Sequence, residues 1–319
     1  MNRGKVVTII GGSGFVGRSL VRQAVAAGYS VRVGCRHPQR AASLRVDGAT
    51  FRQVDVATGR GVDDAVRGST AVINLVGLLF ESGRNSFHAA HVDGTERVVA
   101  ACESHGVARY LHMSALGADV KSASDYARTK GEAEAVVAQS DLDWTIFRPS
   151  VIYGVHDSFL CRFAALSALA PIFPVIAAEM RLQPVWVEDV ARAFVESIGH
   201  RRGCRERIDL AGPKIYSMLT LVEMTMAHLG RKRLLLPLPT VVEKVMAMVM
   251  QLLPTPLLTP DQLIMLQQDS VVDGDPLPDW LPAPMALEQQ LPLILGGDES
   301  SRLQLYLDRS RQEASIKME

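Results

Sequence analysis

The first half of the chain alternates short apolar runs with segments of helical periodicity. The apolar runs predict strands at 5–10, 30–35, 50–54, 71–76, 108–113 and 143–148. Apolar residues at helical spacing predict helices between them, at 15–28, 38–46, 61–67, 86–105 and 124–139. Alternating helices and apolar strands are typical of a parallel sheet covered on both faces. The pattern therefore predicts a doubly wound α/β fold.

The second half has a different pattern. One more strand–helix unit is expected from 185 to about 199, and another strand near 206–211. From 213 onward, prolines recur between amphipathic segments. We therefore predict a first domain of residues 1–155 that is completed by 181–212. A smaller, helix-rich C-terminal lobe would consist of 156–180 and 213–319.

Composition and charge narrow the class of protein. The chain has 319 residues, of which 48% are hydrophobic and 21% charged, as expected for a globular protein of about two domains. Its 34 basic and 34 acidic residues give no net charge, which argues against a nucleic-acid partner. The four cysteines form no CxxC pair, and no metal site is predicted. No stretch reaches the ~18 apolar residues of a spanning helix, so we expect a cytoplasmic protein.

A glycine-rich loop follows the first predicted strand and leads into a helix. It contains Gly11, Gly12, Ser13, Gly14, Phe15, Val16 and Gly17. In the pattern Gly-x-x-Gly-x-x-Gly, the first glycine permits a tight turn, the second a close approach to a diphosphate, and the third close packing of helix on strand. The alternative is an ordinary turn. The strand–turn–helix context favours a nucleotide site, with the first domain as an NAD(P)-binding domain.

The end of the second strand bears on which dinucleotide would bind. An NAD site places an acid there for the ribose 2′-hydroxyl, but this chain has Arg36, with Arg40 one turn later. Both arginines could hold a 2′-phosphate, or both could be solvated surface charges. We therefore expect NADP(H), with NAD(H) as the alternative.

Later strand ends supply further candidate cofactor contacts. Asp55 and Val56, after the third strand, suit the adenine, although Asp55 could instead cap a helix. Asn74, Val76 and Gly77, at the end of the fourth strand, are expected to line the cofactor with their backbone.

Candidate catalytic residues lie further along the chain. Tyr126 and Lys130 are four residues apart in a predicted helix, so their side chains share one face. A nearby ammonium favours the phenolate and lowers the pKa of a tyrosine. Ser114, at the end of the fifth strand, could hydrogen-bond a substrate carbonyl. YxxxK also occurs by chance, but here it follows a glycine loop and a strand-end serine.

With these motifs, residues 5–212 resemble the short-chain dehydrogenase/reductase superfamily in its extended or atypical branch. The resemblance rests on the glycine loop, on Tyr126 with Lys130, and on the segments 91–95 (HVDGT) and 148–154 (RPSVIYG). It implies a Rossmann fold in which Lys130 holds the nicotinamide ribose. Pro149 and Ser150 would flank the nicotinamide, and Tyr126 would be the acid/base of active members.

Within the superfamily, the chain is most similar to the accessory subunit of respiratory complex I that has this fold, and to its bacterial relatives. The similar segments are 112–118, 121–126, 183–190, 258–262 and 269–272. This resemblance implies a tightly held, structural NADPH near the quinone-binding region. His91 stands where extended members have Asn, and the interval from Ser114 to Tyr126 is short for an epimerase.

The segment 234–268 is unusually apolar and follows the basic cluster Arg231-Lys232-Arg233. A Met-rich apolar stretch behind basic residues fits a membrane surface or a hydrophobic partner. It equally fits a core helix of the lobe.

Three functions stay open from the sequence. The first is an accessory or assembly subunit of complex I, located peripherally on the cytoplasmic face of the inner membrane. The second is an NADP(H)-dependent reductase or dehydrogenase for an apolar, quinone- or isoprenoid-like carbonyl compound. The third is a redox sensor whose affinity for a partner differs between the oxidised and the reduced nucleotide.

Overall fold

The computed structural model describes residues 2, 4–39, 49–81, 86–155, 157–199, 203–252 and 256–296. The chain forms two compact units. Unit 1 consists of Met1–Pro149, Val187–Leu210 and Leu277–Pro282, and unit 2 of Ser150–Trp186, Ala211–Pro276 and Ala283–Glu319.

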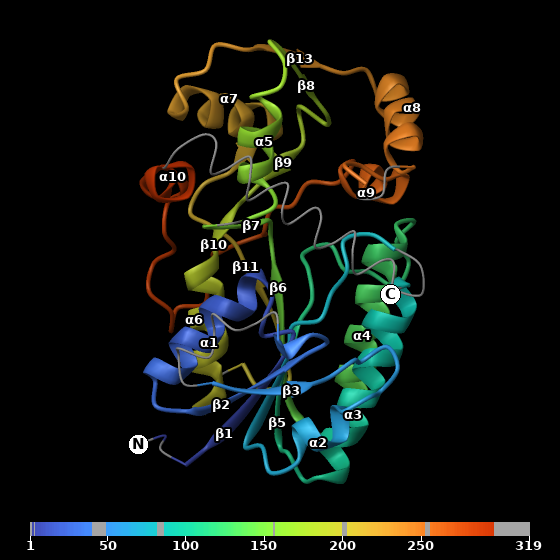
Figure 1. The fold of residues 1–319 in the computed structure, drawn as a ribbon, viewed down its shortest axis with the longest axis vertical. Coiled ribbons are helices and arrows are strands. Elements are labelled where there is room, and N and C mark those ends of the chain that lie inside the picture. Colours follow the sequence, from blue (N-terminus) through green and yellow to red (C-terminus); the bar gives the residue numbers. More distant parts are fainter. Residues whose placement is uncertain are drawn as a thin grey trace. The chain divides into compact units, whose positions relative to one another are not determined.

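Unit 1 is built on a seven-stranded parallel sheet (Figure 1). Its strands are β1 (Val6–Ile10), β2 (Ser30–Cys35), β3 (Thr50–Gln53), β4 (Ala71–Asn74), β5 (Arg109–Met113), β6 (Asp143–Pro149) and β11 (Glu206–Leu210). Their order is β11-β6-β5-β4-β1-β2-β3, so the chain winds outward in both directions from β1. The predicted doubly wound parallel sheet is confirmed. β1 and β4 are nearly continuous runs of buried residues, as expected for strands covered on both faces.

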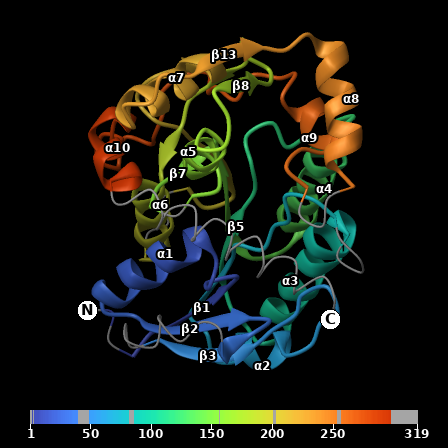
Figure 2. The same ribbon diagram turned by 45° about the horizontal axis from the view of Figure 1, so that its top comes forward.

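Helices cover both faces of this sheet. They are α1 (Phe15–Ala26), α2 (Val62–Val66), α3 (Gly94–Ser104), α4 (Asp125–Gln139) and α6 (Val187–Gly199), and a π-helical turn at Ala89–Asp93 leads into α3. Helices α1 and α6 pack together on one face, and α2, α3 and α4 lie on the other (Figures 1 and 2). Most of the helix predicted at 38–46 lies outside the described residues.

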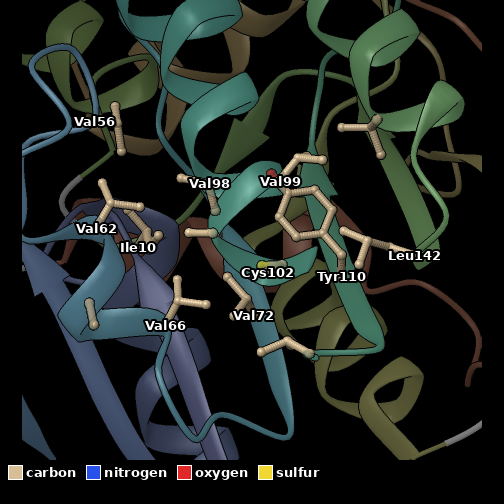
Figure 3. Packing of buried hydrophobic residues seen from close by; sticks show 14 of the residues in the cluster. Ile10, Val56, Val62, Val66, Val72, Val98, Val99, Cys102, Tyr110 and Leu142 are labelled. Atoms are coloured by element: carbon tan, nitrogen blue, oxygen red, sulfur yellow. The ribbon is translucent and has the colours of Figure 1, made fainter. Parts of the chain in front are cut away.

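The core of unit 1 fills the space between the sheet and the second helical layer (Figure 3). Ile10, Val72 and Tyr110 contribute from the strands, while Val98 and Cys102 contribute from α3. All five are almost completely buried. This packing holds the carboxyl ends of β1, β4 and β5 in a fixed relation, which is where the candidate residues lie.

Unit 2 combines short helices with three two-stranded sheets. The pairs are β7 (Ile152–Tyr153) with β10 (Val185–Trp186), β9 (Arg181–Leu182) with β12 (Tyr216–Ser217), and β8 (Ile172–Val175) with β13 (Leu234–Pro237). The helices are α5 (Leu160–Leu166), α7 (Met218–His228), α8 (Thr240–Met250), α9 (Pro260–Met265) and α10 (Leu287–Leu295). The predicted helix-rich C-terminal region is confirmed, with small sheets in addition. Across the described ranges, every helix is too short or too polar to cross a membrane.

Candidate functional site

The glycine loop connects the carboxyl end of β1 to the start of α1. Gly11 has a positive φ of 82°, a conformation that favours glycine, and its amide donates to the carbonyl of Gly34 at 2.8 Å. A Cβ on Gly17 would lie 2.5 Å from Cα of Gly12 and 2.6 Å from the carbonyl oxygen of Gly11. Only glycine at 17 therefore lets α1 approach the turn this closely, which is the packing that the motif requires.

Gly14 faces a different environment. It is the N-cap of α1, and a Cβ there would meet only the carbonyl oxygen of Gly11, at 3.2 Å. No side chain caps α1, and its first turn carries no acidic residue. The first amides of the helix lack intrahelical acceptors and add to its positive dipole end. The loop can therefore receive a diphosphate beside Gly14.

The end of β2 carries no carboxylate. Ser13, from the glycine loop, hydrogen-bonds the thiol of Cys35, and burial raises the pKa of that thiol. Arg36 follows and is half-buried, and its carbonyl accepts from the side chain of Gln53 at 3.2 Å. Arg40 lies outside the described residues. The structure therefore places one of the two predicted arginines directly after β2, where a 2′-phosphate is read.

The candidates after β3 and β4 make contacts that shape their own loops. Oδ1 of Asp55 accepts from the amide of Ala57 at 3.1 Å. Val56 packs on Gly94, where a Cβ would come within 2.8 Å of Cγ2 of the valine. Oδ1 of Asn74 accepts from the amide of Val76 at 3.1 Å, which fixes the turn leading to Gly77.

Lys130 is 2% exposed and points toward the strand ends. Its Nζ donates to the carbonyl of Met113 at 3.0 Å and to that of Val76 at 3.4 Å. A Cβ on Gly77 would lie 3.2 Å from this Nζ, so the backbone of the β4 turn passes directly over the ammonium. Burial lowers the pKa of Lys130 to about 8, against an opposing effect of Glu134.

His91 connects the turn after β4 to helix α4. Its Nε2 accepts from the amide of Leu78 at 3.0 Å, so the ring proton sits on Nδ1, which donates to Oγ1 of Thr129 at 2.9 Å. Burial, with smaller effects of Lys130 and His112, lowers the pKa of His91 to about 2, so the ring is neutral. This neutral bridge fixes the β4 turn relative to the residue next to Lys130.

Ser114 and Tyr126 are the remaining catalytic candidates. Ser114 is 4% exposed, and among the described residues its Oγ has no hydrogen-bond partner. The ring of Tyr126 lies edge-on to Phe87 and His91, and burial raises the pKa of its hydroxyl to about 12. An unpaired buried hydroxyl is costly, so the Ser114 hydroxyl is available to bond a water molecule or a ligand.

The two predicted nicotinamide neighbours fall in different units. Pro149 closes β6 in unit 1, and its carbonyl accepts from the amide of Leu116 at 3.0 Å. Ser150 begins unit 2, where its Oγ is 2.9 Å from both the carbonyl and Oγ of Ser270.

The structure brings most of the predicted residues of unit 1 to the carboxyl ends of its strands. Gly11–Gly17 follow β1, Arg36 follows β2, and Ser114 follows β5, while Lys130 reaches the same edge from α4. The sequence analysis assigns no role to His91 and does not single out Thr129. The histidine at 91, where extended family members have asparagine, is the one sequence feature that pointed to this bridge. In the described part of the chain, no group of three or more His, Cys, Asp or Glu could hold a metal ion.

Comparison with known proteins adds an independent line of evidence. The NAD(P)H-binding family matches residues 11–157. The 40 kDa subunit of mitochondrial NADH-ubiquinone oxidoreductase from Neurospora crassa is 27% identical over 277 residues, which cover 85% of this chain and 73% of that protein. Ceramide reductase from Caulobacter vibrioides is 33% identical over 194 residues, 60% of each chain. A nucleoside-diphosphate-sugar epimerase structure from Staphylococcus aureus has a TM-score of 0.70 at 17% identity, covering 89% of this chain and 99% of that one. At this identity, the structural likeness concerns the fold alone.

Proposed function

We propose that the chain is a cofactor-holding accessory or assembly protein of respiratory complex I, built on an NAD(P)H-binding domain of the atypical short-chain dehydrogenase/reductase type. Its partners would be subunits of that complex, and it would act peripherally on the cytoplasmic face of the inner membrane. The support is the similarity to a complex I subunit along 85% of the chain, together with a glycine loop built for a diphosphate.

The observation that favours holding over turnover is the state of the tyrosine–lysine pair. Burial raises the pKa of Tyr126 to about 12. Lys130 donates to the main-chain carbonyls of Met113 and Val76. A phenol with this pKa is a poor base at neutral pH. The site therefore favours a bound nucleotide over rapid proton exchange.

The dinucleotide would lie along the strand ends of unit 1. Gly14 and the first amides of α1 would meet the diphosphate, and Asp55 with Val56 would border the adenine. Asn74, Val76, Gly77 and Pro149 would line the nicotinamide side, where Lys130 would hold the ribose. When bound, the nicotinamide supplies a hydride donor or acceptor.

We propose NADP(H) as the preferred cofactor, because Arg36 takes the position of the acid in NAD sites. Substituting Arg36→Ser should weaken NADPH binding about tenfold while NADH binding changes little, since one charge-assisted contact to the 2′-phosphate is lost. Fluorescence titration with each nucleotide measures this. Equal losses of affinity for NADPH and NADH would refute the preference for NADP(H).

The accessory role is tested by a pull-down of tagged full-length protein from membranes of the source organism in mild detergent. Native gels and mass spectrometry then identify its partners. Co-migration with complex I subunits in near-stoichiometric amount is the expected result. Recovery of the protein without any respiratory subunit would refute the proposal. Nucleotide released by denaturing the purified protein should be NADP(H).

A second candidate function is that of a reductase acting on an apolar carbonyl compound. It is supported by the unpartnered hydroxyl of Ser114, which could bond a carbonyl oxygen, and by the ceramide reductase relative. Tyr126 would donate the proton, and Lys130 would assist it. Tyr126→Phe should abolish turnover of long-chain ketones with NADPH but preserve nucleotide binding, whereas Tyr29→Phe should preserve both. If Tyr126→Phe turns over as the wild type does, Tyr126 is not the proton donor.

A further inference from the structure

Helix α8 exposes an apolar face that no described residue covers. Six apolar side chains on or just after the helix are 46–80% exposed: Val241, Val242, Val245, Met248, Val249 and Leu252. At about 100° per residue they fall within an arc of about 120°. We call these six residues the α8 apolar face. Most large apolar side chains in a soluble chain are at least partly covered, so this grouping requires an explanation.

The opposite side of α8 is fixed in unit 2. Ala247 is fully buried in a cluster with Leu258 and Leu263, next to α9 (Figure 2). Glu243, the acid of this helix, is 6% exposed, and its Oε1 accepts from the amide of Ala177 at 2.6 Å. The orientation of α8 is therefore set by buried contacts, and its outward side is left without negative charge.

Positive charge borders the apolar face. Lys244 lies on one flank of it, about 40° around the helix from Met248, and is exposed. Lys232 is exposed just before β13, the strand that leads into α8 (Figure 1). On β13, Leu234 and Leu236 are 65% and 49% exposed, so the apolar character continues along the chain.

We infer that the α8 apolar face docks on the surface of a membrane that contains anionic lipid. Aliphatic residues would enter the boundary between headgroups and acyl chains, while Lys244 and Lys232 would reach the headgroup phosphates. The 11-residue helix is about 16 Å long, against the ~30 Å of a hydrocarbon core, so it lies in the plane of the surface. This inference deepens the peripheral membrane location of the proposed function, on which it rests, and it does not depend on the cofactor.

The side chains favour lipid over a protein partner. Protein interfaces are enriched in aromatic residues, Met and Arg and depleted in Lys. The α8 apolar face has no aromatic residue or Arg, contains one Met, Met248, and has the exposed Lys244 on its flank. An apolar helix face with a lysine beside it is typical of a helix that lies at a membrane surface.

Vesicle co-flotation of the full-length protein tests this inference. The vesicles are phosphatidylcholine alone, or phosphatidylcholine mixed equally with phosphatidylglycerol. The wild type should float with the anionic vesicles and more weakly with the neutral ones. Val245→Glu with Val249→Glu should lower binding about tenfold or more, because two apolar groups are lost and two negative charges are added. Lys232→Gln and Lys244→Gln should each lower binding to anionic vesicles about fivefold.

Leu293→Glu is the matched control, since Leu293 is 59% exposed on α10 in the same unit. It should bind vesicles as the wild type does. Absence of wild-type binding to both kinds of vesicle would overturn the inference, as would unchanged binding by the α8 variant. A dimer in solution that the α8 variant dissociates, without vesicle binding, would assign the face to a second copy instead. NADPH affinity should be unchanged in every variant, so a failure here is distinguishable from a failure of the proposed function.

Discussion

Two glycines of the loop after β1 should respond in opposite ways to the same substitution. Gly17→Ala should destabilise the fold, whereas Gly14→Ala should leave the fold intact and weaken nucleotide binding. The difference arises because a methyl group at 17 would meet the backbone of the loop, while one at 14 would meet only the carbonyl oxygen of Gly11. Gly14 is also where we expect the diphosphate to approach the loop.

The contacts at each position determine how much unfolding free energy the substitution should cost. A Cβ at 17 would lie 2.5–2.6 Å from three backbone atoms of Gly11 and Gly12, but contacts between carbon atoms are optimal at about 3.5–4.0 Å. The backbone must therefore move by about 1 Å, and overpacking of this kind costs about 1–3 kcal/mol. The helix preference of alanine returns at most about 1 kcal/mol. At 14, the one contact is at 3.2 Å, and alanine at an N-cap costs a few tenths to about 1 kcal/mol.

Urea unfolding without nucleotide and fluorescence titration with NADPH separate the two effects. Gly17→Ala should lose about 2 kcal/mol of unfolding free energy. Gly14→Ala should lose less than about 1 kcal/mol but bind NADPH at least about tenfold more weakly, because the methyl group blocks the approach of the diphosphate.

Gly28→Ala is the control for backbone strain alone. Gly28 has a φ of 87°, and no atom lies within 4 Å of the position that its methyl group would take. Only the positive φ is therefore penalised, by about 1–2 kcal/mol, and the NADPH affinity should equal that of the wild type. Wild-type NADPH affinity in Gly14→Ala would refute the placement of the diphosphate. Wild-type stability in Gly17→Ala would refute the packing argument.

Two further predictions concern buried charge and pH. Glu134 is 2% exposed and pairs with Arg148 at 2.5 Å, so Glu134→Gln should cost about 2–3 kcal/mol in urea unfolding. Glu132 is partly exposed on the same helix and pairs with the more exposed Arg128, so Glu132→Gln should cost under about 1 kcal/mol, and equal losses would contradict this. Burial lowers the pKa of His91 to about 2 and that of His112 to about 3. As the pH falls below about 6.5, these histidines are therefore protonated in the unfolded chain but stay neutral in the folded one. The free energy of unfolding should then fall by about 1.4 kcal/mol per pH unit for each histidine. His91→Gln should reduce that slope, and an unchanged slope between about pH 6.5 and 5 would show that His91 is already charged in the fold.

Most of the fold of unit 1 could be predicted because its strands are evident from local sequence. β1 and β4 are buried on both faces, so they are apolar runs apart from Thr8 and Asn74. β5 is equally buried but also contains Arg109 and His112. Of the short paired strands of unit 2, only β10 coincides with an expected strand, the one that begins at 185. β7, β9 and β12 have two residues each, too few to show any alternation.

The residues of the candidate site also differ in whether a local sequence pattern identifies them. The glycine loop and the pair Tyr126–Lys130 are local patterns, so spacing alone identifies them. The bridge from Leu78 through His91 to Thr129 joins three segments that only the folded sheet brings together. That the Ser114 hydroxyl has no partner among the described residues is likewise a property of packing, because any strand-end serine has the same sequence signature.

Helix α8 shows why polarity alone could not orient this part of the chain. Its pattern allowed a core helix or an apolar surface, and a core helix would turn its valines inward and Glu243 outward. The structure has the reverse orientation, with Glu243 buried and Val241 74% exposed. The reason lies 66 residues away, where Ala177 adopts a positive φ of 49° and its amide requires an acceptor that Glu243 supplies. Because Glu243 must be buried to accept this hydrogen bond, the valines on the other side of α8 face outward. Their exposure to water is unfavourable and is imposed by the rest of the fold.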